Sequence, residues 1–201
     1  NEYAWEHLHD CTHLWISHFH EDHFHLHTLR KLLKINPSIN VLGNNSYNFK
    51  LDDALSRIGF TNVTSIYENK KIKLNESISV KRLPCTGIDN MLIIKSDEGT
   101  ILNYNDCNLP KSAIQSVSNE IGKVDLLLAN FNHASKILEY PFPTADRIKI
   151  KQKIDFNSVV DLFKPRYTIP FASYHCYRTS EGINQNNSLL NQEDLSKIDS
   201  V

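Results

Sequence analysis

One short segment, residues 17 to 23, constrains the fold and the chemistry of this 201-residue chain more than any other. It reads Ser-His-Phe-His-Glu-Asp-His, so that an H-x-H-x-D-H pattern is formed by His18, His20, Asp22 and His23. The segment follows an apolar stretch, residues 13 to 17, that predicts a short buried strand. Side chains two residues apart in extended backbone point the same way, so His18 and His20 can bind one metal ion together.

A turn after His20 is expected to place Asp22 and His23 where they can bind a second ion, and Asp22 is also the candidate to orient a catalytic water. Imidazole and carboxylate ligands suit zinc, iron or manganese better than magnesium or calcium. The sequence therefore predicts a site for zinc or iron, with one or two ions. The alternative is a histidine-rich surface turn, because five more histidines lie nearby: His7, His9, His13, His25 and His27.

A carboxylate follows an apolar strand pattern in the middle of the chain. Ile101 to Tyr104 predict a strand, and Asp106 comes directly after it. An Asp in this position is often only a turn residue or a helix cap. In this chain, however, it follows the histidine cluster in an α/β pattern, and a carboxylate that bridges two ions holds them about 3.5 to 4 Å apart. Asp106 is therefore predicted to be a metal ligand.

The rest of the chain alternates between strand and helix patterns, which is typical of α/β layers. Apolar periodicity predicts helices near 26–35, 51–58, 110–121 and 145–163, with Asn108 capping the third. Short apolar runs predict strands near 39–42, 63–66, 72–74, 78–83, 91–95, 100–104 and 124–129, and a last buried strand at 167–171. Residues 1–201 are expected to form one domain. Because the motif comes so soon after residue 1, that domain is expected to be a fragment of a longer chain.

The composition of the chain limits the classes of binding partner that we expect. The net charge is −1 and 40% of the residues are hydrophobic, which fits a globular protein with no global field to attract nucleic acid. No apolar run approaches the roughly 18 residues of a membrane span, so no membrane partner is expected. The four cysteines form no CxxC pair and are too few for a disulfide scaffold. We therefore expect a cytoplasmic protein with reduced thiols.

These residues together resemble the metallo-β-lactamase superfamily, whose hallmark is the H-x-H-x-D-H pattern. The resemblance implies an αββα sandwich with its metal site at one edge, between two sheets. Within the superfamily the sequence is most similar to the lactamase-like domain of CMP-N-acetylneuraminate hydroxylases, in stretches at 15–23, 101–107, 126–131, 134–135 and 165–173. Strands precede the motif in that family, so the N-terminal part of the fold is expected to be missing.

Two family histidines are absent at their usual places, and the resemblance suggests which residues replace them. The region before the strand pair contains no histidine but contains Asp89, and the last histidine comes late, at His175. Both are therefore candidate metal ligands, although Asp89 is also an ordinary residue for the start of a strand and His175 an ordinary loop residue. His133 and Arg178 are candidates for substrate contact.

Three functions remain open from the sequence. The first is a metal-dependent hydrolase that uses a metal-activated water on a small-molecule substrate, with phosphate- or nucleotide-containing compounds among the options. The second follows the closer resemblance: an oxidoreductase-type domain that acts on a nucleotide-activated sugar with iron chemistry. That activity also needs a Rieske-type domain, whose paired Cys and His ligands this chain lacks. The third is a degenerate, non-catalytic domain that binds a ligand.

Overall fold

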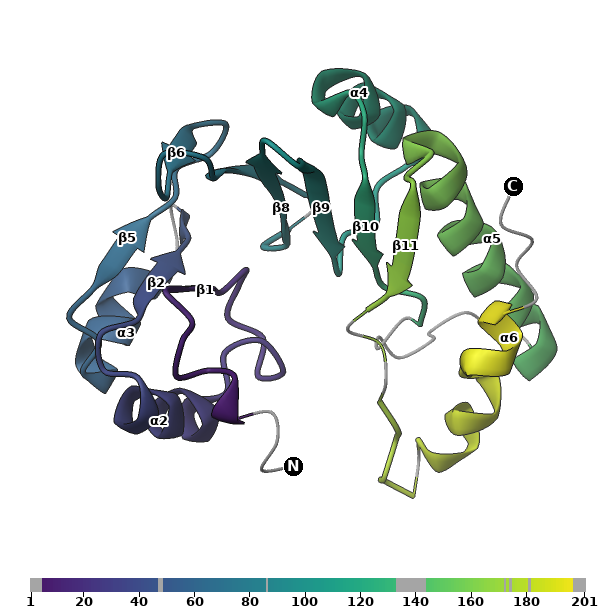
Figure 1. Ribbon diagram of the computed structural model, residues 1–201. Coiled ribbons are helices and arrows are strands. Elements are labelled where there is room, and N and C mark those ends of the chain that lie inside the picture. Colours follow the sequence, from purple (N-terminus) through teal and green to yellow (C-terminus); the bar gives the residue numbers. More distant parts are fainter. Residues whose placement is uncertain are drawn as a thin grey trace. The chain divides into compact units, whose positions relative to one another are not determined.

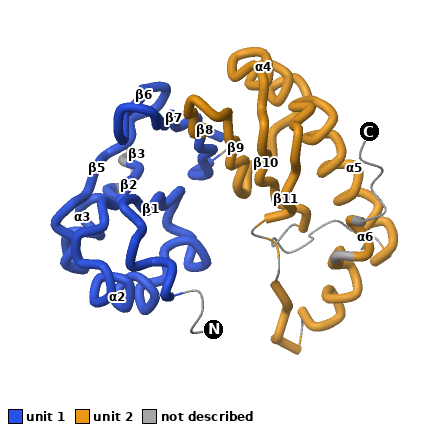
Figure 2. Tube along the Cα trace, in the orientation of Figure 1, with its two compact units in different colours: residues 1–92 blue, residues 93–201 orange. Residues whose placement is uncertain are grey.

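The computed structural model describes residues 5–46, 49–85, 87–132, 144–171, 173, 175–180 and 182–196 (Figure 1). The chain divides into two compact units, residues 1–92 and 93–201 (Figure 2). Each unit is described by itself below.

The first unit is built on a small parallel sheet in the order β1-β2-β5. Its strands are His13–Trp15, Asn40–Gly43 and Val63–Ser65, and its helices are α2 (Leu26–Ile35) and α3 (Leu51–Ile58). The apolar faces of the helices pack with the sheet in one core, whose buried members are Ile16, Leu29, Leu32, Ile39, Val41, Leu51, Leu55 and Phe60. The predicted strand, helix, strand and helix of this region are confirmed, except that β1 is half-buried and not buried as expected.

Two antiparallel strand pairs complete the first unit. The strand β3 (Asn45–Ser46) pairs with β4 (Phe49–Lys50), and β6 (Lys71–Lys73) pairs with β7 (Ser79–Pro84). The strand β8 (Asn90–Ser96) begins in the first unit and continues into the second. The chain thus enters β8 directly after Asp89, one of the candidate ligands.

Gly59 ends α3, directly after the helix that the sequence predicts at 51–58. Its φ of 117° is a left-handed conformation that an L side chain rarely adopts. In this conformation its N–H donates to the carbonyl oxygens of Leu55 and Ser56, which would otherwise lack partners at the helix end.

The second unit contains three parallel strands, β9 (Gly99–Asn105), β10 (Leu126–Ala129) and β11 (Tyr167–Pro170), with β10 between the other two. The connections between them contain α4 (Lys111–Ile121) and α5 (Ala145–Phe163), which pack on each other, and α5 also contacts β10 (Figure 1). Tyr104 is buried among these elements, with its ring 6.0 Å from that of Phe163. After β11 the chain forms the 3-10 helix η1 (Ile183–Ser188) and the short helix α6 (Gln192–Ser196).

Two expectations about the second unit are wrong. The last strand is not buried: Tyr167 is 59% and Ile169 49% exposed, because β11 is the end strand of its sheet. Asn108 is not the cap of α4, because Pro110 occupies that position and its backbone carbonyl accepts from the first turn instead. The apolar residues of β11 are typical of a buried strand, and Asn108 is typical of a helix cap. The exposure of β11 and the start of α4 at Lys111 differ from what these residue types predict.

The described helices can be compared with what a membrane-spanning helix requires. Among them, none combines the length and the apolar character that crossing a bilayer requires.

Candidate metal centre

The histidine motif forms a tight turn between β1 and α2 in the first unit. After β1, the N–H of Ile16 still donates to the carbonyl of Leu42, which extends the strand toward the motif. The N–H groups of His23 and Phe24 then both donate to the carbonyl of His20, at 2.9 and 2.7 Å. These two hydrogen bonds close the turn after His20, and the ring of His23 lies beside that of His18, with centroids 4.3 Å apart.

The loop is anchored by its apolar residues. Phe19 and Phe24 stack with ring centroids 4.9 Å apart, and both pack against the core of the first unit. The side chain of Phe19, which lies between the two predicted ligands, thus packs toward the core. The histidines therefore sit on a supported loop.

Three predicted ligands come together in this unit. Nε2 of His18 lies 2.7 Å from Nδ1 of His20 and 3.4 Å from Oδ1 of Asp89. One ligand atom from each residue lies within 4.8 Å of the other two. His18 is buried, Asp89 is half-buried and His20 is exposed, so the group reaches from the protein interior to solvent. This is an arrangement in which one face of an ion can be held by protein while another remains open.

The donor set fits a first-row metal ion. Two imidazoles and one carboxylate make up the protein ligands of several zinc hydrolases and of non-haem iron(II) sites. Ligands about 2.0 to 2.1 Å from a tetrahedral ion lie about 3.4 Å apart. The distance between His18 and Asp89 already has this value, whereas the ligand atoms of His18 and His20, 2.7 Å apart, would have to move apart by about 0.7 Å.

The other two motif residues form a neighbouring pair. The ring of His23 lies beside that of His18, with centroids 4.3 Å apart, and its Nε2 is 3.5 Å from Oδ2 of Asp22. The Asp22 side chain is 67% exposed. Asp22 and His23 are thus near the three grouped ligands in sequence and in space, but their expected role with a second ion stays a prediction.

The remaining candidates belong to the second unit, and their role at the metal also stays a prediction. Asp106 follows β9 and is half-buried. His175 lies edge-to-face with Tyr177 at 5.4 Å, and its Nε2 is buried with no hydrogen-bond partner among the described residues. Burial raises the pKa of Tyr177, which keeps its phenol neutral beside this imidazole. Arg178 is exposed, and His133 lies outside the described residues.

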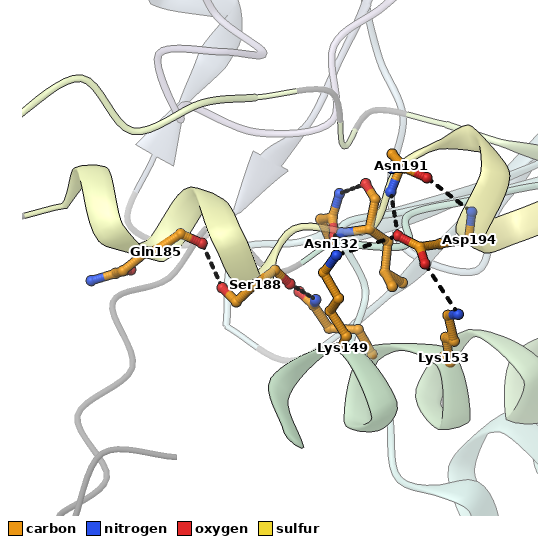
Figure 3. A network of polar contacts seen from close by, with 9 residues as sticks. Asn132, Lys149, Lys153, Gln185, Ser188, Asn191 and Asp194 are labelled. Atoms are coloured by element: carbon orange, nitrogen blue, oxygen red, sulfur yellow. Dashed lines mark hydrogen bonds and ion pairs between the residues drawn. The ribbon is translucent and has the colours of Figure 1, made fainter. Parts of the chain in front are cut away.

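A hydrogen-bond network holds the segment that carries His175 and Arg178. Figure 3 shows the part of this network around Asn132, Ser188 and Asp194. Nδ2 of Asn132, after β10, donates to the carbonyls of Ser173 and Leu190, and its Oδ1 accepts from the N–H of Leu190. Gln152 of α5 donates to the carbonyl of Ser188. Both ends of the segment are thus attached to the body of the second unit.

A series of buried hydrogen bonds joins the two segments of the first unit that carry the ligands. The sequence does not predict it. Nη1 of Arg82 donates to Oδ1 of Asn90 at 2.6 Å, and Nδ2 of Asn90 donates to the carbonyl of Ser17 at 3.1 Å. Burial lowers the pKa of Arg82, and the charge of Glu68 opposes this shift. Asn90 follows Asp89 and Ser17 precedes His18, so these hydrogen bonds fix the distance between the two ligands.

The fold is similar to that of several proteins of known structure. The metallo-β-lactamase fold protein YhfI from Bacillus subtilis aligns with a TM-score of 0.52 and 12% identity over 81% of this chain and 76% of that one. Human tRNase Z, short form, aligns with a TM-score of 0.54 and 13% identity over 83% and 78%. A protein of unknown function from Enterococcus faecalis V583 gives a TM-score of 0.46 and 14% identity, and the match spans 77% of this chain and only 44% of that one.

No protein-family model and no curated protein matches the sequence. At 12–13% identity the two stronger structural matches show the fold alone. The chain therefore has the mixed α/β fold of the metallo-β-lactamases, as the motif predicts.

Proposed function

We propose that this protein is a metal-dependent hydrolase in which His18, His20 and Asp89 bind the more firmly held ion. The observation that carries the proposal is the convergence of three ligand atoms from these residues within 4.8 Å of one another. Two of the residues come from the turn after β1 and the third from the start of β8, far away in the sequence. A histidine-rich surface turn would not account for the carboxylate that joins them.

Each residue has a distinct task in this proposal. His18 offers Nε2 and His20 offers Nδ1, and the carboxylate of Asp89 offsets part of the charge of the ion. A zinc ion held by these residues would lower the pKa of a bound water toward neutrality and would polarise the scissile group. Asp22 accepts a hydrogen bond from the attacking water and so orients it. The candidate ligands of a second ion remain Asp22, His23, Asp106 and His175.

A carboxylate in place of a third imidazole has a consequence for the choice of metal. Zinc accepts two histidines and a carboxylate, and iron(II) accepts the same set in oxygen-using enzymes. The proposal therefore includes zinc or iron.

We further propose a small-molecule substrate that contains phosphate or a nucleotide. The exposed guanidinium of Arg178 can pair with a phosphate, and His133 is the second candidate for substrate contact. The net charge of −1 gives the protein no overall attraction to a polyanion.

The alternative function is a domain like that of CMP-N-acetylneuraminate hydroxylases, acting on a nucleotide-activated sugar. The sequence stretches that resemble that family favour it, and so does the iron(II)-compatible ligand set. The two functions differ in the metal that supports activity and in the need for oxygen. A hydrolase cleaves an activated ester without oxygen, whereas the alternative requires iron, oxygen and an electron donor.

Metal analysis of matched histidine variants tests the proposal. The wild-type protein, loaded with zinc or iron and dialysed, is expected to retain close to one equivalent, measured by plasma mass spectrometry, and to hydrolyse bis(p-nitrophenyl) phosphate without oxygen. His20→Ala should lose the metal. His27→Ala should retain it, because His27 lies on the exposed side of α2, beyond the motif. Retention of no metal by the wild-type protein would refute the proposal, and so would equal losses in both variants.

A further inference from the structure

Ser17, the residue before the first motif histidine, is buried with 3% of its surface exposed. Its hydroxyl oxygen lies 2.8 Å from Nδ1 of His18 and 3.4 Å from Nδ1 of His23. The two imidazole rings lie side by side, 35° from parallel. One hydroxyl thus faces the same ring nitrogen in two histidines of the motif.

The proton count of these groups restricts their arrangement. A neutral imidazole carries one N–H, and a hydroxyl has one proton and two lone pairs. The hydroxyl can accept from two Nδ1–H groups at once, but it cannot donate to two unprotonated Nδ1 atoms. Two arrangements satisfy both contacts: both rings carry their proton on Nδ1, or one ring donates from Nδ1–H while the other accepts the hydroxyl proton and carries its own proton on Nε2. The proposed metal binding by both rings requires the first, because their Nδ1 atoms face the hydroxyl. In that tautomer both Nε2 atoms keep a lone pair for a metal.

We propose that Ser17 is a positioning residue that holds His18 and His23 in the Nδ1–H tautomer and so directs both Nε2 atoms toward metal. The contacts of Nε2 of His18 with His20 and Asp89 are compatible with this assignment and also with the reverse one, in which Nε2–H donates, so that the tautomers measured in solution decide between the two. Nε2 of His18 lies 2.7 Å from Nδ1 of His20, so an unprotonated Nε2 can accept a hydrogen bond from His20 when no ion is bound. The part of this proposal that concerns metal rests on the proposed function, whereas the tautomers exist in the metal-free protein.

Ser17 can act in this way because its own backbone is held. Its carbonyl accepts from Nδ2 of Asn90 at 3.1 Å and from Nδ2 of Asn44 at 3.4 Å. Arg82 in turn donates to Asn90 at 2.6 Å, and all three supporting side chains are buried. The hydroxyl is thus fixed by groups that themselves have little freedom. Partners of this kind typically change metal affinity by about 10- to 100-fold when they are removed.

The first test reads the tautomers without any metal. Metal-free protein with 15N-labelled histidine is studied by long-range 1H–15N NMR near pH 8, where an imidazole of ordinary pKa, about 6.5, is neutral. His18→Gln and His23→Gln assign the two sets of ring signals. The wild-type protein should show Nδ1–H for both rings. Ser17→Ala should shift both toward the Nε2–H form that free histidine favours, and Ser79→Ala, which removes a buried hydroxyl from β7 of the same unit, should change neither.

The second test measures zinc affinity by competition with a chelator. Ser17→Ala should bind zinc roughly 10- to 100-fold more weakly than wild type, and Ser79→Ala should match wild type. An Nε2–H form at His18 or His23 in the wild-type protein would overturn the proposal, as would unchanged tautomers in Ser17→Ala. A tautomer change with unchanged zinc affinity would overturn the directing role. If the wild-type protein binds no zinc or iron, the proposed function fails, while the NMR result still decides the role of Ser17.

Discussion

Replacement of Asn132 by alanine should release the segment that carries His175 and Arg178. The Asn132 side chain is buried and makes three hydrogen bonds to backbone groups, at 3.2 Å to the Ser173 carbonyl and at 3.0 and 2.8 Å to the carbonyl and N–H of Leu190. It thereby ties the start and the end of the segment to the end of β10. Alanine keeps the backbone and removes all three bonds.

The expected cost follows from these bonds. Each contributes about 0.5 to 1.5 kcal/mol net, and three buried backbone groups lose their partner. We therefore expect the free energy for opening of the segment to fall by about 3 kcal/mol, which is roughly a 100-fold change in the opening equilibrium. The bond from Gln152 to the Ser188 carbonyl remains and keeps the segment near α5. The change should therefore be local and should leave the rest of the second unit folded.

Native-state hydrogen exchange measures this effect directly. The amide of Leu190, whose partner is lost, should exchange about 100-fold faster in Asn132→Ala, while amides of β10 should keep their protection. Asn108→Ala is the matched control, because Asn108 is exposed and does not cap α4. Exchange at Leu190 within twofold of wild type would refute the reasoning, as would an equal acceleration in the control.

Two further predictions concern Asp106 and Asp194. Asp106→Asn keeps the shape of the side chain but removes its charge, so in a zinc titration it should weaken binding of the second ion, leave the equivalent that survives dialysis in place, and lower the hydrolytic rate at least 10-fold; unchanged affinity for the second ion and unchanged turnover would make Asp106 a simple turn residue. The Asn191 N–H, and then Lys149 and Lys153, lower the pKa of Asp194 below its ordinary 3.8 against the opposing effect of burial. Its carboxylate therefore stabilises the fold above about pH 4 and loses this contribution as the pH falls through the lowered pKa. The urea midpoint of the wild-type protein should consequently fall more steeply below pH 4 than that of Asp194→Asn, and parallel curves would contradict this assignment.

The helices and most strands could be predicted because their signals are local. The spacing of Leu26, Leu29 and Leu33 indicates α2, and α5 ends at Phe163, as predicted from Pro165. Exposure of β11 could not be predicted, since an apolar strand at the end of a sheet has the same sequence pattern as a central one. The β-propensity of the residues predicts that they form a strand, but their burial depends on the neighbouring elements that cover it.

The candidate site shows the same division. The motif gives His18 and His20 directly, and the missing third histidine draws attention to Asp89. The roles of Ser17, Asn90 and Arg82 could not be predicted, because Asn90 holds a backbone carbonyl 73 positions away in the sequence. Every residue has a backbone carbonyl, so the type of the accepting residue does not indicate such a hydrogen bond. Serine before a histidine is also too common to stand out.

The three parallel strands of the second unit have a consequence for the order of folding. Parallel neighbours cannot form as a hairpin, so β9 meets β10 only after the chain has passed through α4, and β10 meets β11 only after α5. Each pairing closes a long loop and costs chain entropy before any strand contact repays it. We expect α5, with nineteen residues and a Thr144 cap, to be partly formed in the transition state, and β11 to dock late. Substitutions in β11 should then speed unfolding and leave the folding rate almost unchanged.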